Sequence, residues 1–164
     1  MNNKKFGIIF AILILIILGM VIYSAVFTIK NKNAEKSVSI SIDEFNDIIM
    51  ESENFKTSKV SNITEEDISD IYGIEIEDIN KFYGKKSILT TDASMYLLIE
   101  PKEGKLDSAY SKLEQYCVNY ENTWSGYLEA QYDIVVDRKM GKINGYIYLV
   151  ISDDADDIVK DVEK

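Results

Sequence analysis

The stretch SMYLLIEPKEGKLDSAYSKLEQYCVNYENTW, residues 94–124, joins two segments with different hydrophobic patterns. Residues 94–101 are dense in Tyr, Leu and Ile and end at Pro101, the only proline of the chain, which predicts a strand. Over residues 106–124, apolar side chains recur every three or four residues, at Leu106, Tyr110, Leu113, Cys117, Tyr120 and Trp124. This spacing places them on one face of a helix. The stretch therefore predicts a helix that packs on a sheet.

The segments that follow predict two more strands and a last helix. Residues 133–142 (DIVVDRKMGK) and 144–152 (NGYIYLVIS) are expected to form an antiparallel pair through a turn at residues 142–145. Residues 153–164 (DDADDIVKDVEK) predict a closing helix, with Ile158, Val159 and Val162 facing inward.

Two capping boxes precede the strand at residues 94–101. Ser41 with Glu44 predicts a short helix that ends near Ser52, and Thr64 with Asp67 predicts a second one that Gly73 ends. Residues 74–79 (IEIEDI) fit either the start of a strand or another turn. These elements predict an α+β fold in which helices cover one face of a small antiparallel sheet, giving two layers.

Residues 6–29, FGIIFAILILIILGMVIYSAVFTI, contain no charged side chain. At about 1.5 Å per residue, a helix of this length crosses the roughly 30 Å hydrocarbon core of a bilayer. A cleaved signal peptide would end in small residues, whereas the bulky Tyr23 precedes a possible cut after Ala25. A lipid anchor would need a cysteine at the end of the run, and the only cysteine is Cys117. We therefore expect an uncleaved transmembrane helix.

Lysines flank this span in nearly equal numbers, so charge alone does not orient it. A very short amino-terminal tail is typical of a signal-anchor that keeps the tail inside, and we expect a single-pass protein of the cell membrane with its carboxyl-terminal domain outside the cytoplasm. The predicted parts are a cytoplasmic tail (1–5), a transmembrane anchor (6–29), a linker (30–40), an added helical element (41–63) and a globular α+β domain (64–164).

The residue inventory excludes several classes of site. The chain has no histidine, which excludes Ser/His/Asp and Cys/His nucleophiles and any zinc site that uses histidine. Its net charge of −10 disfavours nucleic acid as a partner. One cysteine forms no internal disulfide, and the sequence around Cys117 supplies no cation that would activate a thiol, so we expect Cys117 to be structural. We expect no cofactor and identify no catalytic residue.

The segment WSGYLEAQYD, residues 124–133, admits two interpretations. Aromatic rings beside carboxylates suit sugar binding, which makes Trp124, Tyr127, Glu129 and Asp133 candidate ligand-binding residues. The same residues at helical spacing would instead form core. The position of Trp124 on the stripe of the helix at residues 106–124 favours the core.

Four acids near the carboxyl terminus, Asp153, Asp154, Asp156 and Asp157, are candidate metal ligands, because Ca²⁺ prefers carboxylate oxygens. They lack the spacing and the turn glycine of an EF-hand. The alternative is that Ser152 caps the last helix and the acids of its first turn offset the helix dipole. This second interpretation is favoured.

The order of these pieces resembles a bacterial family known as domain of unknown function 4358, over residues from about 64 to 163. The similar pieces are IYGI (71–74), YLLIEPKEGK (96–105), WSGYLEAQYDIV (124–135) and GYIYLVIS (145–152) before an acidic last helix. The positions that align are Trp124, Tyr127, Leu128, Gln131, Tyr132, Gly145, Tyr146, Ile151 and Ser152. The resemblance implies a short extracytoplasmic protein tethered by a lipid or an amino-terminal helix. It implies no activity.

Two functions fit these observations. The first is a membrane-anchored extracytoplasmic module that binds an envelope protein or a cell-wall component. The second is a carboxylate- or metal-dependent hydrolase that acts on cell-wall glycan or peptide. Hydrolysis without His or Cys would depend on Asp, Glu, Ser or Lys, and none of these stands in a recognisable motif, so the binding module is favoured.

Overall fold

The computed structural model describes residues 40–162. The chain divides into two units, residues 1–37 and 38–164, and all of the described residues belong to the second. The predicted tail and transmembrane anchor, and most of the linker, lie outside the described residues. Within residues 40–162, no helix is both long enough and apolar enough to cross a membrane.

An antiparallel sheet of five strands forms the centre of this unit. The strands are β1 (Val60–Asn62), β2 (Ile79–Ser87), β3 (Met95–Pro101), β4 (Lys139–Ile143) and β5 (Tyr146–Ile151). Their order across the sheet is β1-β2-β3-β5-β4, and every neighbouring pair is antiparallel. The predicted strand at residues 94–101 is therefore β3, and it lies in the middle of the sheet.

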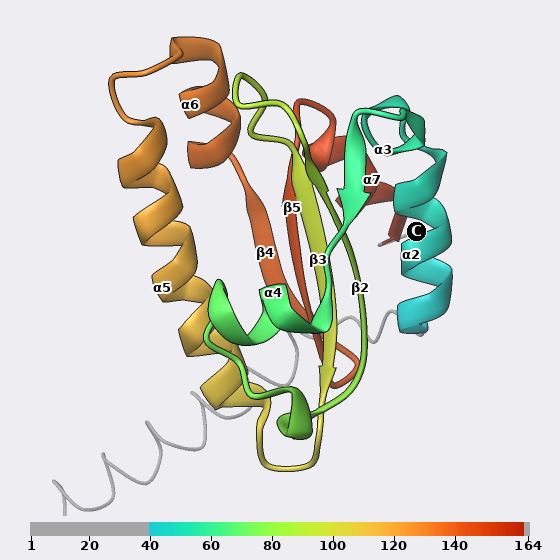
Figure 1. The fold of residues 1–164 in the computed structure, drawn as a ribbon. Helices are drawn as coiled ribbons and strands as arrows, with labels where there is room; N and C mark the ends of the chain where they lie inside the picture. Colours follow the sequence, from blue (N-terminus) through green and yellow to red (C-terminus); the bar gives the residue numbers. More distant parts are fainter. Residues whose placement is uncertain (1–39, 163–164) are drawn as a thin grey trace, which may run out of the picture. The chain divides into compact units, whose positions relative to one another are not determined.

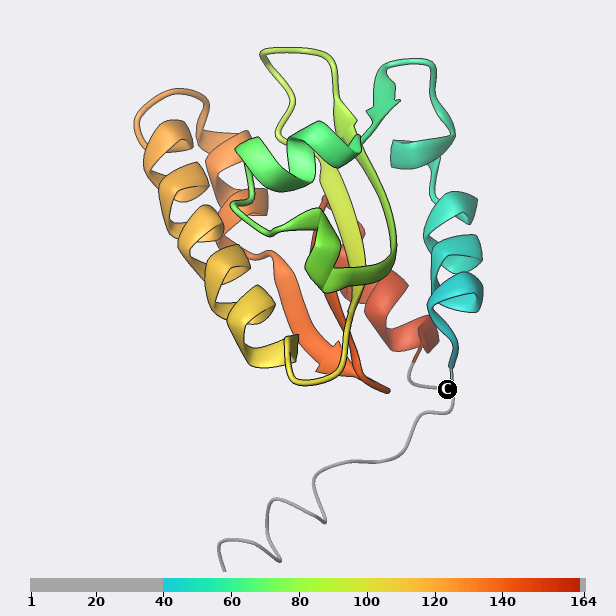
Figure 2. The same ribbon diagram turned by 60° about the horizontal axis from the view of Figure 1, so that its bottom comes forward.

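Helices lie on both sides of the sheet (Figures 1 and 2). The helices are α2 (Ile42–Glu51), α3 (Glu53–Lys56), α4 (Glu65–Asp70), α5 (Leu106–Trp124), α6 (Glu129–Val136) and α7 (Ala155–Val162), and a 3-10 turn, η1, spans Ile76–Asp78. α5 and α6 pack on one face together with α4, and we name this the α5 face. α2, α3 and α7 pack on the other, which we name the α2 face.

The predicted two-layer arrangement is wrong, because each face has its own core and the domain has three layers. On the α5 face, Leu97 of β3 packs among residues such as Leu113. On the α2 face, Leu98 of β3 packs among residues such as Phe45 and Phe55, which are fully buried. The continuous apolar run MYLLI was the signal for burial on both sides, since a half-exposed strand would alternate.

Several predicted elements are confirmed. α5 spans Leu106–Trp124 as expected, and both capping boxes are present, at Ser41 with Glu44 and at Thr64 with Asp67. β4 and β5 form the predicted hairpin. Its two-residue loop has positive φ at both Asn144 and Gly145, which matches the twist of an antiparallel pair.

Three predictions need correction. Residues 133–136, expected to begin a strand, belong to α6, because Leu128, Tyr132 and Val135 face the core at helical spacing. Residues 79–87 form a strand that was not predicted, β2, directly after η1. The segment 41–63, expected to be an added helical element, supplies fully buried side chains to the α2 face, so it is part of the core of the domain.

Candidate functional site

Trp124, a candidate ligand-binding residue, belongs to the core. Its side chain is 6% exposed and it lies in the cluster of the α5 face. An aromatic row leads to it along α5: the ring centroids of Tyr116 and Tyr120 are 5.4 Å apart, and those of Tyr120 and Trp124 are 6.1 Å apart. The Tyr120 hydroxyl donates to the Ala93 carbonyl at 3.1 Å. Burial raises the pKa of both tyrosines, so they remain neutral.

The other candidates of this segment do not join Trp124 in a cleft. The chain turns at Gly126, which has a φ of +78°, so α5 and α6 are separate helices. Tyr127 is 57% exposed, and Glu129 and Asp133 are exposed on α6. The structure therefore separates a buried indole from two solvated carboxylates. Of the other three candidates, Tyr127 is the one whose ring contacts Trp124, with ring centroids 5.7 Å apart.

The four candidate metal ligands point to different partners. Asp154 accepts hydrogen bonds from Ser52 Oγ at 2.7 Å and from Ser152 Oγ at 2.7 Å, and Asn54 Nδ2 donates to both Asp153 and Asp154. These bonds hold the start of α7 against the junction of α2 and α3. The Ser152 hydroxyl thus bonds a carboxylate rather than the backbone of α7.

The last two acids each pair with a lysine. Asp156 lies 2.9 Å from the Lys139 ammonium, whose hydrogen bond lowers the pKa of that carboxyl, and Asp157 lies 3.4 Å from Lys160. Over residues 40–162, no group of three or more metal-ligating side chains is arranged to hold an ion. Asp153, Asp154 and Asp156 thus contact other elements, whereas Asp157 pairs within α7.

Cys117 is buried, as expected, with 1% of its surface exposed. Burial raises the pKa of its thiol to about 11, so the thiol is not activated. Beside it, a groove of about 350 Å³ runs between α5, α6 and β4. The cation of this groove, Arg138, is already bound to Glu121 at 2.9 Å and to the Val135 carbonyl at 2.8 Å.

A second cleft, which the sequence did not predict, lies between α2 and β2; we name it the α2–β2 cleft. Its volume is about 360 Å³. The residues that line it are Asn46, Met50, Asn62, Ile63, Phe82, Tyr83, Gly84, Lys85 and Tyr96. At the edge of the cleft, Gly84 allows Ile63 and Leu97 to pack closely on the α5 face, because a Cβ atom at this position would lie 2.7 Å from Ile63 Cδ1.

The polar side chains of this cleft come from three strands and a helix. In the sheet register, Lys85 of β2 stands opposite Asn62 of β1 and opposite Tyr96 of β3. Residues directly opposite each other point to the same face, so these three side chains form a row on the α2 face. The Tyr96 hydroxyl donates to Asn46 Oδ1 of α2 at 2.8 Å. Burial raises the pKa of Tyr96 to about 12.

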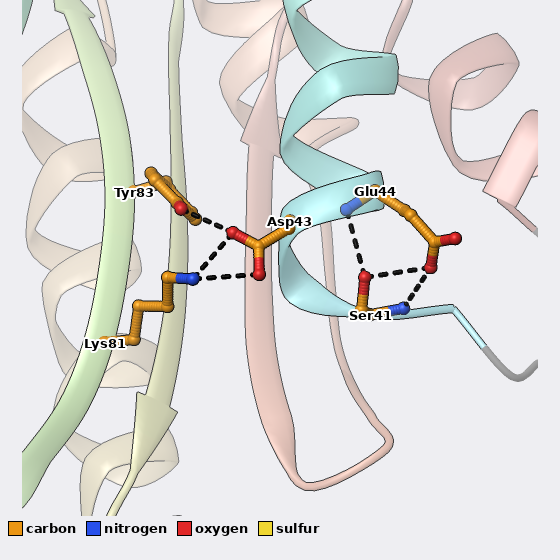
Figure 3. A network of polar contacts seen from close by, with 5 residues as sticks. All are labelled: Ser41, Asp43, Glu44, Lys81 and Tyr83. Atoms are coloured by element: carbon orange, nitrogen blue, oxygen red, sulfur yellow. Dashed lines mark hydrogen bonds and ion pairs between the residues drawn. The ribbon is translucent and has the colours of Figure 1, made fainter.

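A polar network fixes the first turn of α2 to β2 next to this cleft (Figure 3). The Lys81 ammonium lies 2.6 Å from Asp43 Oδ1, and the Tyr83 hydroxyl donates to the same oxygen at 2.5 Å. These hydrogen bonds, the one from Lys81 first, lower the pKa of Asp43. Lys81, Tyr83 and Lys85 alternate along β2, and that alternation in KFYGK was the signal by which the strand and its polar face could have been found.

Comparison with known proteins gives one match. The model of the family described as Domain of unknown function (DUF4358) matches residues 53–152, and nothing matches among curated proteins or solved structures. The match begins before and ends before the stretch of resemblance seen in the sequence, so it contains α3 to β5 but neither α2 nor α7. Because more than half of the chain is matched, the protein belongs to the DUF4358 family.

Proposed function

We propose that this protein is a membrane-anchored, extracytoplasmic binding module of the bacterial envelope, and that its ligand enters the α2–β2 cleft. The charge-free run of residues 6–29 supports the anchor. A long segment after a span is translocated largely regardless of its charge, which supports the outward orientation of the domain.

One observation carries the binding site. The α2–β2 cleft combines an apolar wall, from side chains such as Met50 and Tyr83, with hydrogen-bonding groups at Asn62 and Lys85. Apolar surface beside a few converging polar groups is the usual composition of a ligand site. The groove beside Cys117 is of similar size, but Glu121 and Val135 already occupy its guanidinium. No specific observation in the described part of the chain favours the hydrolase alternative.

Crosslinking in intact membranes tests this function. A photoreactive amino acid at Asn62, which is exposed and lines the cleft, should form a discrete adduct with an envelope component. The matched control is the same amino acid at Asn122, which is exposed on α5 outside the cleft. Equal adducts from both positions, or none from Asn62, would contradict a binding site in the cleft.

Protease accessibility tests the orientation separately. External protease added to cells stripped of their wall should digest the domain while leaving the anchor in the membrane. A domain that survives until the membrane is permeabilised would show that it faces the cytoplasm. The mass of the mature protein should include residues 1–25, since the anchor is expected to be uncleaved.

A further inference from the structure

The lysines of β2 differ in what they bind. Lys81 pairs with Asp43 on the α2 face, and Lys86 pairs with Asp67 at 2.6 Å on the α5 face. Lys85 lies between them in sequence, is half-buried, and forms no ion pair with any residue in 40–162. Its ammonium donates to the Phe55 carbonyl at 3.2 Å. An ammonium has three N–H donors, so this single bond leaves donors for another acceptor.

Two side-chain amides stand near this ammonium. Asn62 is directly opposite Lys85 in the register, which brings its amide to the same face of the sheet. Asn46 accepts the Tyr96 hydroxyl through Oδ1, so its NH₂ group remains able to donate. The cleft therefore offers one full positive charge together with neutral donors, which is the composition that an anion requires.

The surroundings limit what kind of anion fits. On the α2 face, Met50 and the ring of Tyr83 give the cleft an apolar wall, so the ligand carries an apolar group. A volume of about 360 Å³ lies near the lower end of ligand pockets, which points to a small molecule or the end of a chain. The net charge of −10 repels multiply charged anions, and a single cation balances a single negative charge.

From these contacts we propose that Lys85 and Asn62 bind the carboxylate of a small, partly apolar monoanion in the α2–β2 cleft, with the apolar group against Met50 and the ring of Tyr83. The inference rests on the proposed binding function and names the chemical class of its ligand. A half-buried ammonium without a counter-ion is unfavourable, so a carboxylate that pairs with it gains more than one that pairs with a fully solvated lysine.

Ligand-observed NMR on the full chain in detergent micelles tests the proposal with N-acetyl-leucine and its neutral counterpart, N-acetyl-leucinamide. We expect saturable binding of the acid and at least tenfold weaker binding of the amide, a difference of about 1.4 kcal/mol. Lys85→Met keeps the apolar stem and should abolish the preference for the acid. Lys85→Arg keeps the charge and should retain it, which separates loss of charge from loss of fold.

Lys112→Met is the matched control, because Lys112 is also half-buried but lies on α5, outside the cleft. It removes the same charge and should leave the preference unchanged. Equal affinity for acid and amide would overturn the carboxylate inference while leaving a binding module in place. A preference that survives Lys85→Met would also overturn it, as would the absence of saturable binding of either probe, whereas the crosslinking at Asn62 decides the proposed function independently.

Discussion

The two faces of the sheet are covered by different kinds of side-chain contact. On the α5 face, a row of aromatic rings in contact runs from Tyr72, which follows α4, through Tyr116 and Tyr120 of α5 to Trp124, and burial raises the pKa of the tyrosine hydroxyls. On the α2 face, an equally buried core around Phe45 is bordered by polar bonds, at Asp43 and at Asp154. The α5 face is thus covered mainly by hydrophobic contacts. The α2 face combines a hydrophobic core with polar contacts at its edge, where the cleft lies.

The family match divides the same two faces. α4, α5 and α6 lie inside the matched residues 53–152, whereas α2 and α7 lie outside them and pack against each other over the α2 face. The cleft therefore has one wall from matched residues, Asn62 and Lys85, and one from outside the match, Asn46 and Met50. The cleft thus lies at the boundary between the matched sheet and a helix outside the matched residues.

The largest expected effects compare one core residue of each face. Trp124→Ala and Phe45→Ala should each lower the free energy of unfolding by about 3–5 kcal/mol, because each deletes a large buried ring. Thermal melts of residues 37–164 followed by circular dichroism measure both. A cost below about 1 kcal/mol for Phe45→Ala would mean that α2 is an accessory helix, as the sequence alone suggested. An unchanged melt for Trp124→Ala would revive the sugar-binding interpretation.

An intermediate effect is expected where α7 meets α2 and α3. Asp154→Ala removes the acceptor of Ser52 and Ser152, and should cost about 1–3 kcal/mol. Asp157→Ala is the matched control, because its pairing with Lys160 is exposed and should be worth less than about 0.5 kcal/mol. Urea denaturation of the two variants separates them, and equal midpoints would show that the Asp154 bonds do not stabilise the domain.

A smaller effect depends on pH and concerns Asp67. Burial alone would raise the pKa of this carboxyl, but hydrogen bonds from Lys86 and Thr64 outweigh burial and lower it. A lowered pKa stabilises the fold above the pKa of an unfolded aspartate, about 3.9, and the contribution is lost as the pH falls through the folded value. Asp67→Asn should therefore destabilise at neutral pH by about 1 kcal/mol and by less near pH 3.

Denaturation of wild type and Asp67→Asn at neutral pH and near pH 3 tests whether the difference in stability becomes smaller in acid. A difference between the two proteins that grows in acid would contradict the lowered pKa. The carboxylate on the α2 face that corresponds to Asp67 is Glu44, which forms the first capping box with Ser41. Hydrogen bonds from Ser41 lower the pKa of Glu44.

The last prediction concerns the rate at which the Cys117 thiol reacts, and it involves no change in stability. Because burial raises the pKa of its thiol to about 11, labelling of the native protein by a thiol reagent near neutral pH should be slow and should speed up in urea. Labelling of the native protein at the rate of the urea-unfolded protein would contradict the core position of Cys117 on the α5 face.

The sequence predicted the α5 face better than the α2 face for a physical reason. α5 carries a stripe of period 3.6 over 19 residues, and β3 is a dense apolar run, so both signals exceed the background. β2, INKFYGKKS, has three lysines and a glycine. Only Ile79 and Phe82 of this strand contact the core of the α5 face, and its lysines form ion pairs or line the cleft. Propensity alone therefore missed the strand that holds the candidate site.

Other differences between the prediction and the structure also have physical causes. DIVV at residues 133–136 has the β-branched composition of a strand, but contacts of Tyr132 and Val135 with the α5 face make it helical. Both α2 and α7 were predicted as helices, but the spacing of apolar residues does not tell which face of a sheet a helix covers, so the second layer was missed. The acids at 153–157 were placed correctly at the start of the last helix, but their partners, Ser52 and Asn54, are distant in sequence.

The most direct test of the account compares the two faces in intact membranes. A photoreactive amino acid is placed at Asn62, in the cleft of the α2 face, and in a second protein at Tyr127, the exposed aromatic at the end of α5. If the ligand binds in the α2–β2 cleft, the photoreactive group at Asn62 forms a discrete adduct, and Lys85→Met reduces the yield of that adduct. The group at Tyr127 then forms no comparable adduct. A discrete adduct from Tyr127 with none from Asn62 would contradict the account and move the binding function to the α5 face.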